Sequence, residues 1–133
     1  MEKSTLQLAI ADFAKQEFEI PEQAISYYIE GFCGDFSIAL YHVLKELGEE
    51  CFFASCWGTP DNMHEKCWIH DMVEWKGKYW DILGPHTAAE ESKFWKRWYA
   101  IPDVEVRQGA GDDTQVLPKE IANVERKLHA LLR

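Results

Sequence analysis

The sequence lacks an excess of basic residues: 14 Lys and Arg stand against 23 Asp and Glu, which gives a formal charge of −9. This balance repels a phosphate backbone, so we expect no nucleic-acid partner. The chain also lacks an apolar run long enough to cross a membrane, and its start, MEKSTLQLAIADFAKQ, has no signal-peptide core. We therefore expect a cytoplasmic protein with no membrane partner.

The chain has four cysteines in 133 residues, and it has no internal repeat and no low-complexity segment. A cytosolic chain of this size can bury a sufficient core without disulfides, so we expect all four cysteines to be thiols. The length predicts a single domain over residues 1–133.

Hydrophobic spacing predicts, in order along the chain, helices, a small sheet and further helices. Apolar residues recur at helical intervals before and after a segment rich in aromatic residues, and this order indicates an α+β fold. The segments expected are helices over 5–30, a cysteine-bearing helix over 33–47, an antiparallel sheet over about 50–84 and a C-terminal helical region over 88–133. Within the last region, Val104 and Val106 predict a short strand.

A β-hairpin is expected in the second half of the sheet. Residues 67–75 alternate between polar and apolar, a turn follows at 76–78, and residues 79–83 form the returning strand. Counting outward from a three-residue turn places His70 opposite residue 84, so that Asp81 lies three positions nearer the turn.

The segment GFCGDFSIAL places Cys33 at the start of the predicted cysteine-bearing helix. A helix start favours a thiolate, although a carboxylate in the same first turn, Asp35, opposes this effect. A thiolate nucleophile also needs a base and a group that orients the base. His70 and Asp81 follow in the sequence and are the candidates for these two roles, whereas a buried structural thiol is the alternative interpretation of Cys33.

The other histidines are weaker candidates for the base. His64 lies in a polar loop, and His42 and His129 fall on helices where we expect them at the surface. His86 follows a Gly-Pro pair and could line a cleft.

A zinc site is a further alternative, with Cys56, His64, Cys67 and His70 as its ligands. It is disfavoured because Cys67 and His70 are separated by an odd number of residues along one strand and so point to opposite faces. There is also no Cys-x2-Cys pair, and we predict no metal site.

Two segments together, GFCGDFSIAL and IHDMVEWKGKYWDILG, resemble the transglutaminase-like branch of the papain-like superfamily over about residues 27–86. The resemblance implies a central helix that carries the cysteine and packs on a small antiparallel sheet. It also implies a catalytic triad of Cys33, His70 and Asp81 that acts on a protein or peptide substrate through a thioester, without a cofactor. Hydrolysis, deamidation and acyl transfer all fit this chemistry.

The oxyanion hole of such an enzyme needs a hydrogen-bond donor close to the thiol. Papain-like proteases have a glutamine six residues before the cysteine, and the residue at that position here is Tyr27. The candidate donors are therefore the Cys33 backbone N–H, the Tyr27 hydroxyl and the side chain of Gln23.

A non-catalytic function is the alternative to an enzyme. An acidic domain on the same scaffold could bind and inhibit a basic partner, and Cys33 would then serve only in packing.

Overall fold

The structure is a computed structural model that describes residues 1–111 and 116–132. It is a mixed α+β fold of helices and a small antiparallel sheet, as the sequence predicts. In chain order the elements are α1 (Lys3–Glu17), α2 (Pro21–Tyr28), α3 (Cys33–Glu46), β1 (Phe52–Gly58), β2 (Cys67–Trp75), β3 (Lys78–Asp81), β4 (Gly84–His86), α4 (Ala88–Tyr99), β5 (Glu105–Gln108) and α5 (Pro118–Leu132).

The predicted helical segment 5–30 consists of two helices, α1 and α2. Proline at the first position of α2 starts the second helix, because it has no N–H and its φ angle suits a first turn. The next helix, α3, covers residues 33–46, within one residue of the predicted range 33–47. None of the helices in the described residues is both long enough and apolar enough to cross a bilayer.

The sheet has the strand order β4-β3-β2-β1-β5, with antiparallel pairing throughout. It extends beyond the predicted range of about 50–84, because β4 reaches residue 86 and β5 comes from the region 88–133. The short strand expected at Val104 and Val106 is β5, in which Val106 pairs with Cys56. Residues 112–115 and 133 of the predicted C-terminal region lie outside the described residues.

The turn between β2 and β3 has two residues, not the three predicted, and this changes the register by one position. Trp75 pairs with Lys78, and Val73 pairs with Trp80. Lys76 and Gly77 form the turn with φ angles of 49° and 75°, the left-handed conformation that a tight two-residue hairpin turn requires.

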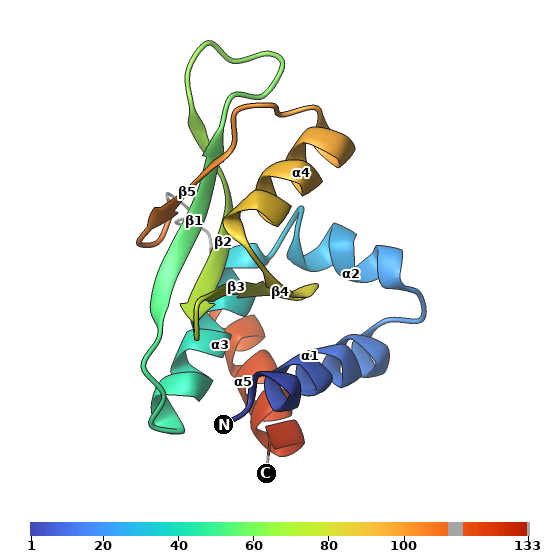
Figure 1. Ribbon diagram of the computed structural model, residues 1–133. Coiled ribbons are helices and arrows are strands. Elements are labelled where there is room, and N and C mark those ends of the chain that lie inside the picture. The colour runs from blue at the N-terminus through green and yellow to red at the C-terminus, as the bar shows by residue number, and fades with distance from the viewer. Residues whose placement is uncertain (112–115, 133) are drawn as a thin grey trace.

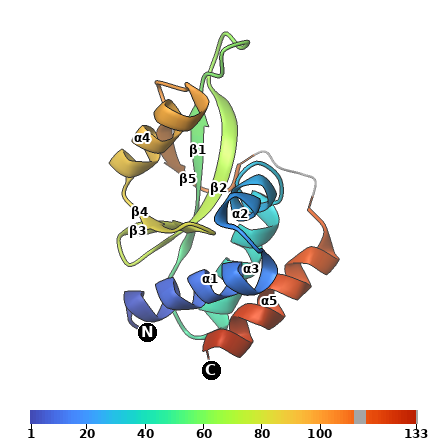
Figure 2. The same ribbon diagram turned by 90° about the vertical axis from the view of Figure 1, so that its right-hand side faces the viewer.

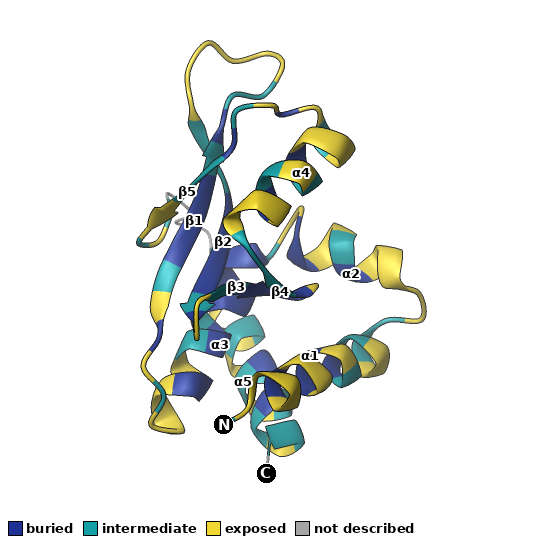
Figure 3. Ribbon diagram, viewed as in Figure 1, coloured by how far each residue is buried: buried dark blue, intermediate teal, exposed yellow. Residues whose placement is uncertain are grey.

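The helices gather on one side of the long β1–β2 ribbon, and both chain termini lie at the same end of the molecule (Figure 1). α3 packs against β2, while α1 and α5 pack against each other and α5 packs along α3 (Figure 2). The buried residues face inward from these elements toward one continuous core (Figure 3). Cys33, the first residue of α3, interacts with His70 of β2, so the start of the helix lies next to this part of the strand.

Candidate active site

A tight connection between α2 and α3 fixes Cys33. The backbone N–H of Phe32 donates to the carbonyl oxygen of Tyr27 at 2.6 Å. A Cβ atom on Gly31 would lie 2.9 Å from that same carbonyl oxygen, so the close approach requires glycine. Cys33 is the first residue of α3, and only 3% of its surface is exposed.

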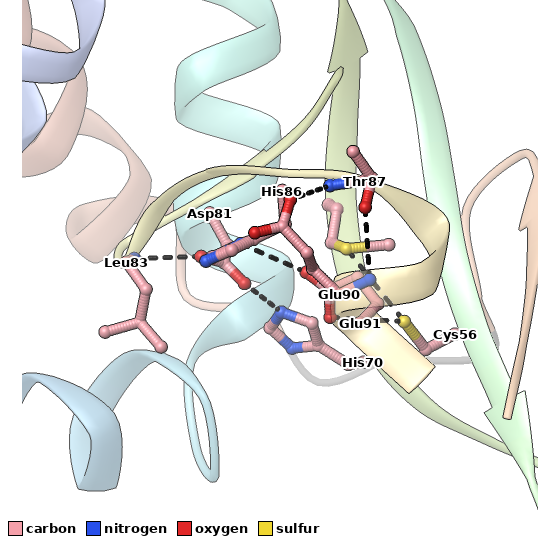
Figure 4. A network of polar contacts seen from close by, with 9 residues as sticks. Cys56, His70, Asp81, Leu83, His86, Thr87, Glu90 and Glu91 are labelled. Atoms are coloured by element: carbon pink, nitrogen blue, oxygen red, sulfur yellow. Dashed lines mark hydrogen bonds and ion pairs between the residues drawn. The ribbon is translucent and has the colours of Figure 1, made fainter. Parts of the chain in front are cut away.

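His70 and Asp81 form a buried hydrogen-bonded pair across β2 and β3. The distance from His70 Nε2 to Asp81 Oδ2 is 2.9 Å, and the two side chains are 1% and 4% exposed (Figure 4). The backbone N–H of Leu83 donates to the other carboxylate oxygen, Asp81 Oδ1, at 2.8 Å. Both oxygens of Asp81 are therefore held in place, and one of them orients the imidazole.

Cys33 interacts with the same imidazole. Burial lowers the pKa of His70, but hydrogen bonding to Asp81 and to Cys33 outweighs burial and raises this pKa to about 10. Since Nε2 faces Asp81, Nδ1 is the ring nitrogen left for the thiol, and it is buried without a hydrogen bond of standard geometry. The structure thus brings together the three residues that the sequence singled out.

Trp95 of α4 covers the imidazole. The centroids of the Trp95 and His70 rings are 5.6 Å apart, and Trp95 is itself buried. The ring therefore contributes to the low exposure of His70 and helps to exclude water from it.

The side chains proposed for the oxyanion hole also interact with other parts of the chain. Gln23 Oε1 accepts hydrogen bonds from the backbone N–H groups of Glu19 and Ile20, at the start of α2. Burial and interaction with Glu120 of α5 raise the pKa of Tyr27, and Asp35 in the first turn of α3 adds to this effect. The backbone N–H groups in the first turn of α3 are also candidate donors, because a first turn has no acceptors within its own helix.

Asp35 serves a structural contact in the first turn of α3. Its side chain is fully buried, and its Oδ2 accepts a hydrogen bond from the backbone N–H of Leu117 at 3.0 Å. This bond ties the start of the cysteine-bearing helix to the segment that leads into α5.

A second polar cluster shares Asp81 with the triad. The cluster consists of Asp81, His86 and Glu91, and one potential ligand atom from each lies within 4.8 Å of the others. Among the residues that the structure describes, it is the one group of three side chains placed to bind a metal ion. The His86 Nδ1 atom is 3.2 Å from Glu91 Oε1, and the Cys56 thiol donates to Glu91 Oε2 at 3.8 Å (Figure 4). A metal ion in this cluster would compete with the protons that hold these contacts and with the Asp81–His70 bond.

The sequence analysis did not identify Glu91, and it gave His86 only as a residue that could line a cleft. Hydrogen bonding to Glu91 raises the pKa of His86, and this effect outweighs burial, which lowers it. Thr87 and Glu90 form a capping box at the start of α4, and this sequence signal places Glu91 in the first helical turn.

The four residues of the alternative zinc site do not converge. Cys56 and His70 pair across β1 and β2, but Cys67 lies at the far end of β2, opposite Gly58. The Cys67 thiol contacts the carbonyl oxygen of Glu65.

His42 and His129 form ion pairs at the surface with Glu125 and Glu46, at 2.6 and 2.5 Å.

All four cysteines are free thiols in environments that differ. Burial raises the pKa of Cys51 and of Cys56, whereas Cys67 is partly exposed. Among the four, Cys33 is the one whose side chain interacts with the His70 imidazole.

Comparison with known proteins assigns no family: no family model matches the chain, and neither a curated protein nor a solved structure matches it.

Proposed function

We propose that the protein is a cysteine-dependent amide hydrolase or acyltransferase, with Cys33 as the nucleophile, His70 as the base and Asp81 as the orienting group. One observation carries the proposal: a single buried imidazole interacts with the Cys33 thiol and also with the Asp81 carboxylate. The raised pKa of His70 keeps the ring protonated at neutral pH, and an imidazolium next to a cysteine is the usual partner of a reactive thiolate.

The proposed reaction has two stages. In the first, the Cys33 sulfur attacks the substrate carbonyl carbon and forms a C–S bond, while first-turn N–H groups of α3 stabilise the oxyanion. The imidazolium of His70 then gives its proton to the leaving nitrogen, the C–N bond breaks, and a thioester remains.

In the second stage, water or an amine attacks the thioester carbonyl and loses its proton to the now neutral imidazole. The C–S bond breaks, and the acyl group leaves as an acid or as a new amide. The role of Asp81 is to hold Nε2 so that Nδ1 faces the sulfur.

Support for papain-like architecture comes from the packing of α3 on β2 and from the order of the three residues along the chain. The cysteine begins a central helix, the histidine lies on one strand and the aspartate lies on the next, which is the arrangement that the resemblance implies. A protein or peptide substrate follows from the same resemblance.

The non-catalytic interaction module remains the second candidate, and the low exposure of Cys33 favours it. In a residue that is 3% exposed, the thiol is available to a substrate only when the side chains over it move. The two candidates therefore differ in whether this buried sulfur reacts.

Competitive labelling with iodoacetamide at neutral pH tests the proposal, with the labelled positions identified by peptide mapping. Exposure alone would direct the reagent to Cys67, since the other three thiols are buried. If His70 activates Cys33, that residue is labelled at least about tenfold faster than Cys67, and His70→Ala removes the preference. His42→Ala, which changes a surface histidine, leaves the preference unchanged. Labelling of Cys67 first, in the unmodified protein, would favour the interaction module.

A further inference from the structure

A groove with an acidic rim lies between α2 and α4. It has a volume of about 530 Å³ and is lined by Glu22, Ile25, Glu30, Phe94, Trp98 and Tyr99. α2 and α4 lie on the same side of the β1–β2 ribbon, and the chain leaves α2 toward the start of α3 (Figure 1).

Both walls of this groove lead to the candidate active site. On the α2 side, Glu30 lies three residues before Cys33, in the connection that places the thiol. On the α4 side, the Tyr99 ring packs on Trp95 with 4.7 Å between centroids, and Trp95 packs on His70. The groove is thus linked to the triad through Tyr99 and Trp95 on one side and through the segment from Glu30 to Cys33 on the other, although no triad residue lines it.

The lining combines an apolar floor with negative charge. Ile25, Phe94 and Tyr99 are partly buried, whereas the Trp98 side chain is 65% exposed, which is unusual for so large an apolar surface. Glu22 and Glu30 are exposed, and no Lys or Arg is among the six lining residues. Apolar surface next to unneutralised carboxylates suits a segment that has both apolar and cationic side chains.

The exposed tryptophan already contacts a cation. The guanidinium of Arg97 lies 5.4 Å from the centre of the Trp98 ring, within the range of a cation–π contact. The Tyr99 hydroxyl faces Glu30, since burial and that carboxylate together raise the pKa of Tyr99 to about 12. This contact joins α4 to the segment before Cys33 at one end of the groove.

We propose that this groove binds an extended peptide segment in which a lysine or arginine lies next to an apolar residue. The cationic side chain interacts with Glu22 and Glu30, and the apolar residue packs on Phe94 and Trp98. That this segment is part of the substrate rests on the proposed function. If Cys33 attacks a peptide carbonyl, the groove selects which peptides are bound close enough to react.

Peptide binding to the full chain carrying Cys33→Ala tests the groove without turnover. The probes are fluorescein-labelled hexapeptides with leucine and phenylalanine on either side of one variable position, which is lysine, arginine, norleucine or glutamate. Fluorescence anisotropy should show that the lysine and arginine peptides bind about tenfold more tightly than the glutamate peptide. In Glu22→Gln/Glu30→Gln the difference should fall below about threefold, and Trp98→Ala should weaken all four peptides.

A matched control removes the same charge elsewhere. Glu2 and Asp61 are exposed and outside the groove, so Glu2→Gln/Asp61→Asn should retain the preference for basic peptides. Equal binding of the glutamate peptide, a preference that survives Glu22→Gln/Glu30→Gln, or no binding at millimolar peptide would each overturn the proposal. Peptide binding is measured in Cys33→Ala, whereas the proposed function is tested by labelling Cys33. A failure of the groove proposal can therefore be distinguished from a failure of the proposed function.

Discussion

His70 Nε2 and Asp81 Oδ2 are 2.9 Å apart, although the two residues do not pair directly in the sheet. The observed register, in which Val73 pairs with Trp80, places residue 81 opposite residue 72 if it continues by one step. Residues 70, 72 and 81 then share one face, because side chains alternate along a strand and paired residues point the same way. The register expected from a three-residue turn would have directed Asp81 to the opposite face.

The turn that sets this register should be sensitive to its glycine. Gly77 has a φ angle of 75°, which an L-residue with a Cβ rarely adopts, and no atom lies close enough to clash with an added Cβ. Gly77→Ala should therefore lower the free energy of unfolding by about 1 kcal/mol through backbone strain alone. Urea denaturation measures this change.

The neighbouring turn residue supplies the control. Lys76 has a φ angle of 49°, and asparagine tolerates this conformation better than lysine does. Lys76→Asn should be neutral or slightly stabilising. A similar loss of stability in both variants would indicate that contacts of the turn, and not its backbone conformation, determine the effect.

The pH dependence of stability should report the His70–Asp81 pair. The pKa of His70 is about 10 in the folded protein, above its ordinary value of 6.5 in an unfolded chain. Protonated His70 therefore stabilises the folded protein fully below pH 6.5. This contribution to the free energy of unfolding is lost as pH rises from 6.5 to 10, by at most about 1.4 kcal/mol per pH unit.

Urea denaturation of the protein and of His70→Gln, each between pH 6 and 10, isolates this contribution. The difference in the free energy of unfolding between the two proteins should shrink as pH rises, since titrating groups that do not interact with His70 contribute equally to both. A difference that stays constant across this range would show that His70 is not protonated at neutral pH.

Local patterns were sufficient to predict most of the fold. The start of α3 at Cys33 follows from the glycine before it and the apolar spacing after it, and both signals lie within one segment. The place of β5 in the sheet does not follow from such patterns. Its pairing with β1 joins segments about fifty residues apart in the sequence, and no local pattern specifies that contact.

The candidate site likewise contains residues that local sequence indicates and residues that only the tertiary fold brings in. Cys33, His70 and Asp81 have recognisable sequence contexts, whereas Glu91 reaches the cluster only because α4 folds back over the sheet. A glutamate in the first turn of a helix is ordinarily exposed, so the sequence does not indicate that this one is 3% exposed. For Gln23 the sequence did not indicate that its amide oxygen accepts hydrogen bonds from backbone N–H groups at the start of its own helix.

The buried Glu91 should control the titration of His86. Hydrogen bonding to Glu91 is the main cause of the raised pKa of His86, and burial opposes it. Glu91→Gln should therefore lower this pKa, and NMR titration of the His86 ring measures the change. Glu90→Gln is the matched control, because Glu90 contributes least to the pKa of His86 and its carboxamide can preserve the capping box. A pKa of His86 that is the same in Glu91→Gln and in the unmodified protein would contradict the contact.

Asp81 should determine the pH range over which Cys33 reacts. The Asp81 carboxylate raises the pKa of His70, so the ring should lose its proton at lower pH when a neutral amide replaces this carboxylate. The amide oxygen can still accept a hydrogen bond from His70 Nε2. Asp81→Asn should therefore slow the labelling of Cys33 by iodoacetamide at pH 7–9 by about tenfold, because less imidazolium remains to stabilise a thiolate. Asp81→Ala should slow it further, since the ring then also loses its orientation.

Asp71→Asn provides the control for a general loss of stability. Asp71 is another buried carboxylate of β2, and it accepts hydrogen bonds from the Trp68 indole and from the backbone N–H of Gly111. It lies one residue from His70, on the opposite face of the strand. This variant should unfold at lower urea concentration but keep the pH profile of Cys33 labelling. If Asp71→Asn and Asp81→Asn slow the labelling equally, the loss reflects weakened packing of the sheet, and Asp81 has no special role in activating the thiol.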